Sequence, residues 1–139
     1  MSQLVNRKVV LKSHPQGALK ESDFEIVNDE VGEVTAGSVL VRVDVLSIDA
    51  FIRTTLDGGG FHTSAQLGGV VPALGVGTVV ESADPGFAVG DTVTGPFCSQ
   101  SYALLPSVML RKLDTSIAPA TAFLGALGMA TGLTSYTGI

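Results

Sequence analysis

Few side chains in this sequence could do chemistry, and they are scattered along the chain. His14 and His62 are the only histidines and Cys98 is the only cysteine among the 139 residues. Zinc sites usually draw such ligands from closely spaced pairs, and none of these three residues lies near another. We therefore expect no metal site, and we interpret both histidines as single surface residues.

Activated nucleophiles and nucleotide-binding loops have no recognisable motif here either. No basic residue or helix start stands beside Cys98 to activate its thiol, and no serine lies in a G-x-S-x-G elbow. The 17 glycines include neither a G-x-G-x-x-G pattern nor a phosphate-binding loop of the Walker type. We interpret Cys98 as a buried structural cysteine and the glycines as turns, bulges and one loop.

Asp49 and Arg53 are a charged pair whose spacing suggests a shared role. Four residues apart on a helical turn, they would face each other and could form an ion pair. The pair is either a structural salt bridge after a strand or a brace for the wall of a pocket. Phe51, which lies between them, is then an apolar wall residue or part of the core. Tyr102 and Tyr136 are possible proton donors, but core positions are more typical of tyrosine.

Composition limits the classes of function. Only 15% of the residues are charged and 45% are hydrophobic, so the chain should fold rather than remain disordered. The net charge of −5 comes without any cluster of basic residues, which argues against nucleic acid and anionic membranes as partners. No signal peptide is recognisable, so we expect a cytoplasmic protein.

The elements that must position these residues are mostly strands. In residues 38–47, Val39, Val41, Val43 and Val45 fall on one face of a predicted strand. Asp49 is a good N-cap, so we expect a short helix or turn after it, followed by a loop to about residue 71. Further strands are predicted at residues 7–11, 23–27, 76–82, 92–95, 101–105 and 109–113.

The C-terminal stretch differs from the rest. Residues 116–139 contain no charged side chain, but Pro119, four glycines and four threonines argue against a membrane span. The pattern is helical after Pro119, best over residues 120–127, and we expect it to pack against other protein. Taken alone, the residues predict a single acidic, mostly β domain, a barrel or a sandwich, with no self-contained active site.

Five stretches in order along the chain resemble one enzyme family. The sequence is similar to the medium-chain dehydrogenase/reductase superfamily, and within it to the zinc-free, NADP-dependent prostaglandin reductase and leukotriene hydroxydehydrogenase group. The resemblance is carried by Asn6-Arg7 with Pro15-Gln16-Gly17, by VLVRVDVLSIDAFIR at 39–53, by GVGTVV at 75–80 with PGFAVGDTV at 85–93, by LRKLD at 110–114 and by LGALGMATGLTSY at 124–136.

Some positions depart from the family pattern. Ala50, Phe51 and Ile52 stand where the group usually has Pro, Tyr and Met, so a hydrogen bond from that tyrosine to substrate is not available here. Zinc-dependent relatives carry a cysteine where this chain has Ser47, and Gly-His-Glu where it has residues 72–74. The resemblance therefore does not imply a metal.

The resemblance implies a fold that is mostly β with short helices, a GroES-like, partly open β-barrel. We expect residues 1–118 to form this domain and residues 119–139 to form a helical segment leading to a dinucleotide-binding Rossmann domain that is absent from these residues. Met129 and Thr134 match family positions near the nicotinamide of NADP(H). Phe51, Phe61 and His62 would flank substrate, with Asp49 and Arg53 as support, and no catalytic residue is assigned.

The implied reaction transfers hydride from NADPH to the β-carbon of an α,β-unsaturated carbonyl, such as a 2-alkenal, an enone or a quinone. We expect no turnover from these residues alone and a homo-oligomeric full-length enzyme. The alternative is a stand-alone GroES-like binding or assembly module, with residues 116–139 as its oligomer contact.

Overall fold

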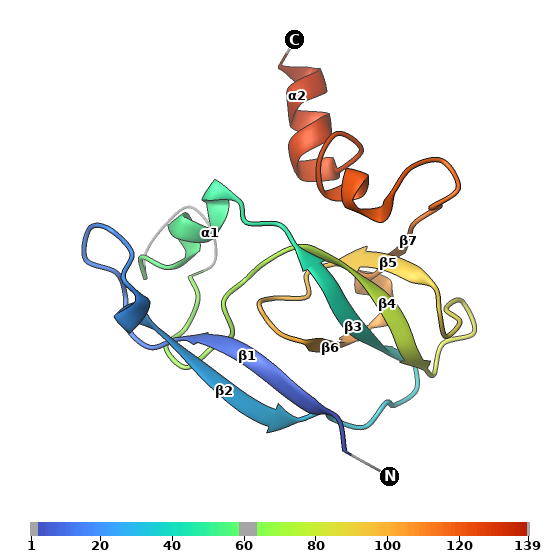
Figure 1. Ribbon diagram of the computed structural model, residues 1–139, viewed down its shortest axis with the longest axis horizontal. Coiled ribbons are helices and arrows are strands. Elements are labelled where there is room, and N and C mark those ends of the chain that lie inside the picture. The colour runs from blue at the N-terminus through green and yellow to red at the C-terminus, as the bar shows by residue number, and fades with distance from the viewer. Residues whose placement is uncertain (1–2, 59–63, 139) are drawn as a thin grey trace.

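The computed structural model describes residues 3–58 and 64–138, and this part of the chain is mostly β with short helices. The described residues form seven strands and six short helical elements of the 3-10, π or α type, and Figure 1 labels the strands and the two α-helices. The strands are β1 (Val5–Leu11), β2 (Phe24–Glu30), β3 (Ser38–Leu46), β4 (Gly75–Ser82), β5 (Thr92–Gly95), β6 (Tyr102–Pro106) and β7 (Arg111–Lys112).

 The helical elements of the barrel and its connections are η1 (Glu21–Asp23), α1 (Ala50–Thr55) and η2 (Ser107–Met109). The C-terminal segment contains η3 (Ala120–Leu124), the π-helix η4 (Met129–Leu133) and α2 (Thr134–Thr137).

The strands form two antiparallel sheets. β1 pairs with β2, and the other sheet has the order β6-β3-β4-β5-β7. β1 joins the two, because its free edge binds segments from distant parts of the chain. The Val9 N–H donates to the Ser99 carbonyl and the Val71 N–H donates to the Val9 carbonyl, both at 2.9 Å. These bonds close part of the gap between the sheets and give a partly open barrel, as the family resemblance implied.

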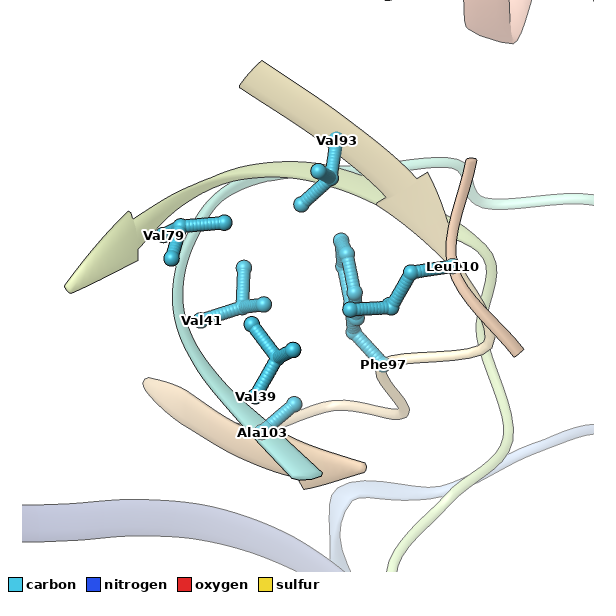
Figure 2. Close-up of a cluster of buried hydrophobic side chains, with 7 residues drawn as sticks. All are labelled: Val39, Val41, Val79, Val93, Phe97, Ala103 and Leu110. Carbon is cyan, nitrogen blue, oxygen red and sulfur yellow. The ribbon is translucent and has the colours of Figure 1, made fainter. Parts of the chain in front are cut away.

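The main core lies inside the curved five-stranded sheet. Figure 2 shows its apolar side chains pointing toward one another, with the Phe97 ring beside Leu110. A second cluster packs α1 and the chain after it against β1 through Leu11, Leu56 and Val71. Burying such side chains contributes roughly 1.5–3 kcal/mol each relative to exposure. The main cluster consists of Val39, Val41, Val79, Val93, Phe97, Ala103 and Leu110.

β3 does not keep the simple alternation that its sequence suggests. Its register to β4 shifts between Leu40 and Val41 and again between Val43 and Val45. A shift of this kind turns the strand and redirects its side chains. As a result Leu40 is buried, only 3% exposed, while Val45 is 39% exposed. The strand itself was predicted correctly, but its two register shifts interrupt the regular alternation of faces that the sequence predicted.

The C-terminal segment, residues 119–138, leaves the barrel beyond β7 and projects from it (Figure 1). The predicted helix over 120–127 is a single 3-10 turn, η3, and the helical conformation resumes only at η4 after Gly128. The predicted strand at 109–113 is likewise reduced to β7, because η2 occupies the residues before it. Within the described ranges, no helix has the length and apolarity needed to cross a membrane.

Candidate active site

A pocket of about 240 Å³ opens between the barrel and the C-terminal segment. The barrel contributes the chain that follows β3, the residue before β4, the end of β5 and the region around β7. The C-terminal segment contributes η3 and the start of η4. The pocket is lined by Ser47, Asp49, Leu74, Thr94, Gly95, Pro96, Met109, Arg111, Phe123, Leu124, Gly128, Met129 and Ala130.

Glycines let the C-terminal segment fold back tightly over this pocket. A Cβ atom at Gly132 would overlap the Ala126 carbonyl oxygen, and one at Gly128 would lie 2.7 Å from the Phe123 carbonyl oxygen. The Gly128 carbonyl in turn accepts hydrogen bonds from the Gly132 and Leu133 N–H groups at 2.9 and 3.1 Å. This tight turn places Met129 at the pocket although its side chain is 71% exposed.

Asp49 and Ser47 form a polar pair on the barrel side of the pocket. The Ser47 hydroxyl donates to Asp49 Oδ2 at 2.7 Å, and the Ser47 N–H donates to the Leu74 carbonyl at 2.8 Å. Asp49 occupies the N-cap position of α1 with an extended backbone, yet its side chain makes no capping hydrogen bond. The helix start was predicted correctly, but the carboxylate binds the neighbouring hydroxyl instead of the helix N–H groups.

Arg53 pairs with a different carboxylate from the one its spacing suggested. Its guanidinium forms an ion pair with Asp57, one turn further along, and donates to the Gly17 carbonyl at 2.9 Å. The predicted contact between Asp49 and Arg53 is therefore wrong, because Asp49 lies at the helix start and turns toward Ser47. Arg53 instead ties the end of α1 to the loop between β1 and β2.

His14 lies in that same loop and also holds the end of α1. Its Nδ1 lies 2.8 Å from the Leu56 carbonyl oxygen, which can only accept, so Nδ1 carries the proton. The side chain is half-buried rather than free on the surface. The imidazole therefore acts as a structural link between this loop and the chain after α1.

Two residues of the pocket have electrostatic properties that matter for a ligand. The hydroxyl proton of Thr94 is donated to the Gly75 carbonyl at 2.8 Å. Arg111, by contrast, has no hydrogen bond or ion pair from its guanidinium to any residue that the structure describes. Its neighbour Lys112 is paired with Asp91 at 2.8 Å. The pocket is thus mainly apolar, with one guanidinium available to a ligand.

The comparisons with known proteins identify the family of this domain. Residues 7–113 match the family described as the N-terminal domain of oxidoreductase. The chain belongs to the medium-chain dehydrogenase/reductase superfamily. It is 35% identical over 139 residues to the NADP(+)-dependent 2-alkenal reductase of Nicotiana tabacum, and 35% identical over 135 residues to the NADPH-dependent curcumin reductase of Escherichia coli strain K12.

These matches cover most of the chain but only part of each relative. They span 96% of this chain, against 40% of the tobacco enzyme and 39% of the bacterial one. The crystal structure of CurA from Vibrio vulnificus superposes with a TM-score of 0.84 at 28% identity, over 96% of this chain and 39% of that one. CurA in complex with NADPH gives a TM-score of 0.82 at 25% identity. The chain therefore spans about two fifths of the length of these medium-chain enzymes.

The structure brings together only some of the residues that the sequence singled out as the site of a medium-chain reductase. Met129 and Asp49 line the pocket. Thr134 begins α2 and Phe51 lies in α1, and among the described residues neither contributes to the lining of this pocket. Phe61 and His62 lie outside the described residues.

Sequence reasoning missed several lining residues, above all Thr94, Arg111 and Phe123. Arg111 is part of the LRKLD match, but nothing local distinguishes it from its neighbour Lys112. The two residues differ because they are consecutive in β7, and consecutive side chains of a strand point to opposite faces of the sheet. Phe123 has no signal beyond an apolar stretch, and its place at the pocket depends on the turn at residues 125–128.

Cys98 is not an activated nucleophile, and the described residues contain no cluster of metal ligands. Cys98 has a left-handed backbone with φ of 60°, which is rare for a residue other than glycine. Burial raises the pKa of its thiol above the ordinary value, so the sulfur is not an activated thiolate. It is half-buried rather than fully buried. Among the described residues, no group of three or more His, Cys, Asp or Glu side chains is arranged to hold a metal ion.

Proposed function

We propose that this chain is the substrate-side domain of a zinc-independent reductase that uses NADPH to reduce the carbon–carbon double bond of α,β-unsaturated carbonyls. The observation that supports this best is the pocket between the barrel and the C-terminal segment. Met129, which the resemblance matches to a family position near the nicotinamide, is one of its lining residues. The relatives named above reduce a 2-alkenal and curcumin with NADP(H), as their names state.

The residues of the pocket fit the flat, weakly polar ring of a nicotinamide and a small enone. Leu74, Pro96, Phe123 and Met129 offer apolar surface, and the volume of about 240 Å³ accommodates compact groups. Reduced NADPH would supply the hydride. The protein would hold the two reactants in contact and limit the access of water. We take Thr134 as a second contact on the cofactor side and Phe51, Phe61 and His62 as contacts on the substrate side.

Zinc independence is part of the proposal. Zinc would need a cluster of ligands, and Ser47 stands at the position where zinc-dependent relatives carry cysteine. Its hydroxyl is already bound to Asp49. A hydroxyl that donates to a carboxylate is a poor zinc ligand, since zinc sites are built from thiolate, imidazole and carboxylate groups.

The test uses the natural full-length protein that contains this chain. NADPH consumption is followed by absorbance with 2-alkenals, cyclic enones and quinones, before and after treatment with a strong chelator. We expect turnover with at least one of these classes, unchanged by the chelator. The absence of NADPH consumption with every class would contradict the proposed activity, and activity that is lost on chelation and restored by zinc would contradict the metal-free mechanism.

The 139-residue chain serves as the matched control. Without a partner surface to complete the cofactor site, we expect it to consume no NADPH with a substrate that the full-length protein reduces. Turnover by the short chain alone would show that the barrel and the C-terminal segment hold a complete active site.

A further inference from the structure

The polar side chains of the pocket differ in what they can offer to a ligand. Ser47 and Thr94 have each given their hydroxyl proton to a protein oxygen, the Asp49 carboxylate and the Gly75 carbonyl. Asp49 is a carboxylate and can only accept. A carbonyl oxygen, which also only accepts, finds no partner in these three groups.

Arg111 is the exception. A guanidinium carries five N–H donors and no acceptor, and those of Arg111 are bound by no other residue in the described part of the chain. The other lining side chains are apolar, apart from the three just discussed. Within the described residues, Arg111 is therefore the side chain of the pocket that is able to donate to a ligand oxygen.

The proposed reaction creates a need for such a donor. When the β-carbon of an enone accepts hydride from NADPH, the electron pair of the carbon–carbon double bond shifts and negative charge collects on the carbonyl oxygen. Solvent then protonates the α-carbon, the carbonyl forms again, and NADPH leaves as NADP⁺. A cation placed at that oxygen stabilises the transition state more than the ground state, because the charge develops during the step.

We propose that Arg111 is a catalytic residue that donates to the substrate carbonyl oxygen and stabilises the enolate formed by hydride transfer. This inference rests on the function proposed above. It also gives the ligand a direction, with the carbonyl oxygen toward Arg111 on β7. Arginine suits the task because its planar guanidinium presents several N–H donors in a fixed geometry.

The test compares Arg111→Met and Arg111→Lys in the full-length natural protein, with Lys112→Met as the matched control. Lys112 is the other residue of β7 and carries the same charge, but it pairs with Asp91. Removing one donor from an oxyanion site typically costs about 10²–10³-fold in rate. We expect that loss in kcat for Arg111→Met, a smaller loss for Arg111→Lys, and kcat within about twofold of the wild type for Lys112→Met.

Two further readouts separate catalysis from a structural role. Guanidinium ion added at low concentration should restore part of the activity of Arg111→Met, since it can occupy the vacated position, and should do nothing for Lys112→Met. In the complex with NADP⁺ and an enone, the infrared carbonyl stretch should lie at lower frequency in the wild type than in Arg111→Met. Circular dichroism checks that each variant is folded.

The outcomes distinguish this inference from the proposed function. If the wild type reduces enones and Arg111→Met does so equally well, the role of Arg111 is refuted while the function stands. An unchanged carbonyl stretch together with no rescue by guanidinium also refutes it, even where kcat falls. If the wild type reduces no enone or quinone, both the function and the role of Arg111 are wrong.

Discussion

The role of a side chain in this domain depends on the hydrogen bonds that it already makes to other protein groups. Asp49 could have capped α1, but it accepts the Ser47 hydroxyl instead and becomes part of a pocket wall. Arg111 and Lys112 are neighbours with the same charge, yet only Lys112 has a carboxylate partner among the described residues. The sequence shows the residue types, but only the fold shows which donors and acceptors are left for a ligand.

At the scale of single residues, we predict that Asn6 stabilises the barrel. It is 6% exposed, accepts the Tyr102 N–H at 3.0 Å and donates to Gln100 Oε1 at 2.9 Å, so it ties β1 to the start of β6. Asn6→Ala leaves both partners without a bond, and we expect a loss of about 2 kcal/mol in the free energy of unfolding. Urea denaturation measures this.

Gln3→Ala is the control for Asn6, because Gln3 is exposed and donates only to the Glu30 side chain at 3.3 Å. Its effect should stay within about 0.5 kcal/mol. Equal stabilities for the two variants would show that the Asn6 bonds do not hold β1 to the barrel.

At the scale of elements, the sequence predicted where strands occur better than how they face. All seven strands overlap a predicted segment, because β-branched residues and turn formers are strong local signals. The two register shifts of β3 have no such signal, since they depend on its pairing with β4. The same limit applies to the site: Asp49 and Met129 were singled out from motifs, whereas Thr94 and Phe123 reach the pocket through pairing and turns distant in sequence.

Gly77 gives a prediction about the pairing of β3 and β4. A Cβ atom there would overlap the Arg42 carbonyl oxygen and a Val41 methyl group. Gly77→Ala forces these paired strands apart, and we expect a loss of about 3 kcal/mol by urea denaturation. At Gly32 the added atom would meet only a Leu104 methyl group at 3.3 Å.

Gly32→Ala is therefore the matched control and should cost less than about 1 kcal/mol, since a side chain can shift where a strand backbone cannot. A Gly77→Ala protein as stable as Gly32→Ala would mean that the strands are not packed so closely.

Hydrogen bonds in the turn after β4 should make the stability of the folded domain depend on pH. Asp84 accepts the Ser107 hydroxyl at 2.5 Å and the Gly86 N–H at 2.7 Å, and these bonds lower the pKa of its carboxyl below the ordinary 3.8. A lowered folded-state pKa adds stability that is present above the unfolded value and is lost as pH falls through the folded value. Stability should therefore fall below about pH 4, and less steeply in Asp84→Asn.

Denaturant midpoints measured across acid pH test this effect. Asp57→Asn is a useful comparison, since Asp57 makes an exposed ion pair with Arg53 rather than bonds to a turn. If Asp84→Asn and the wild type lose stability in parallel as the pH falls, the turn does not contribute to acid sensitivity.

The whole molecule combines a well-packed barrel with an exposed apolar C-terminal segment. Leu127, Met129, Leu133 and Tyr136 are all exposed, Tyr136 by 79%. The chain has few charged residues partly because the surface of the C-terminal segment, and not only the core, is built from apolar side chains. Exposed apolar surface of this kind is typical of protein contacts, and we predict such a contact for this segment.

The 139-residue chain should therefore self-associate as its concentration rises. Sedimentation velocity should show a species larger than the monomer, persisting at high salt because the contact is apolar. Leu133→Lys combined with Tyr136→Lys should restore the monomer, whereas Val108→Lys, an exposed apolar residue on η2, should not. A wild-type chain that stays monomeric at all concentrations contradicts this view of the segment.

We propose that the natural protein containing this domain delivers hydride to the β-carbon of an unsaturated carbonyl. The most direct measurement is enone reduction with NADPH carrying deuterium at the transferable position, followed by NMR of the product. We predict a saturated carbonyl with deuterium on the β-carbon. An allylic alcohol with deuterium on the carbonyl carbon would contradict the account, because it would show reduction of the carbonyl itself.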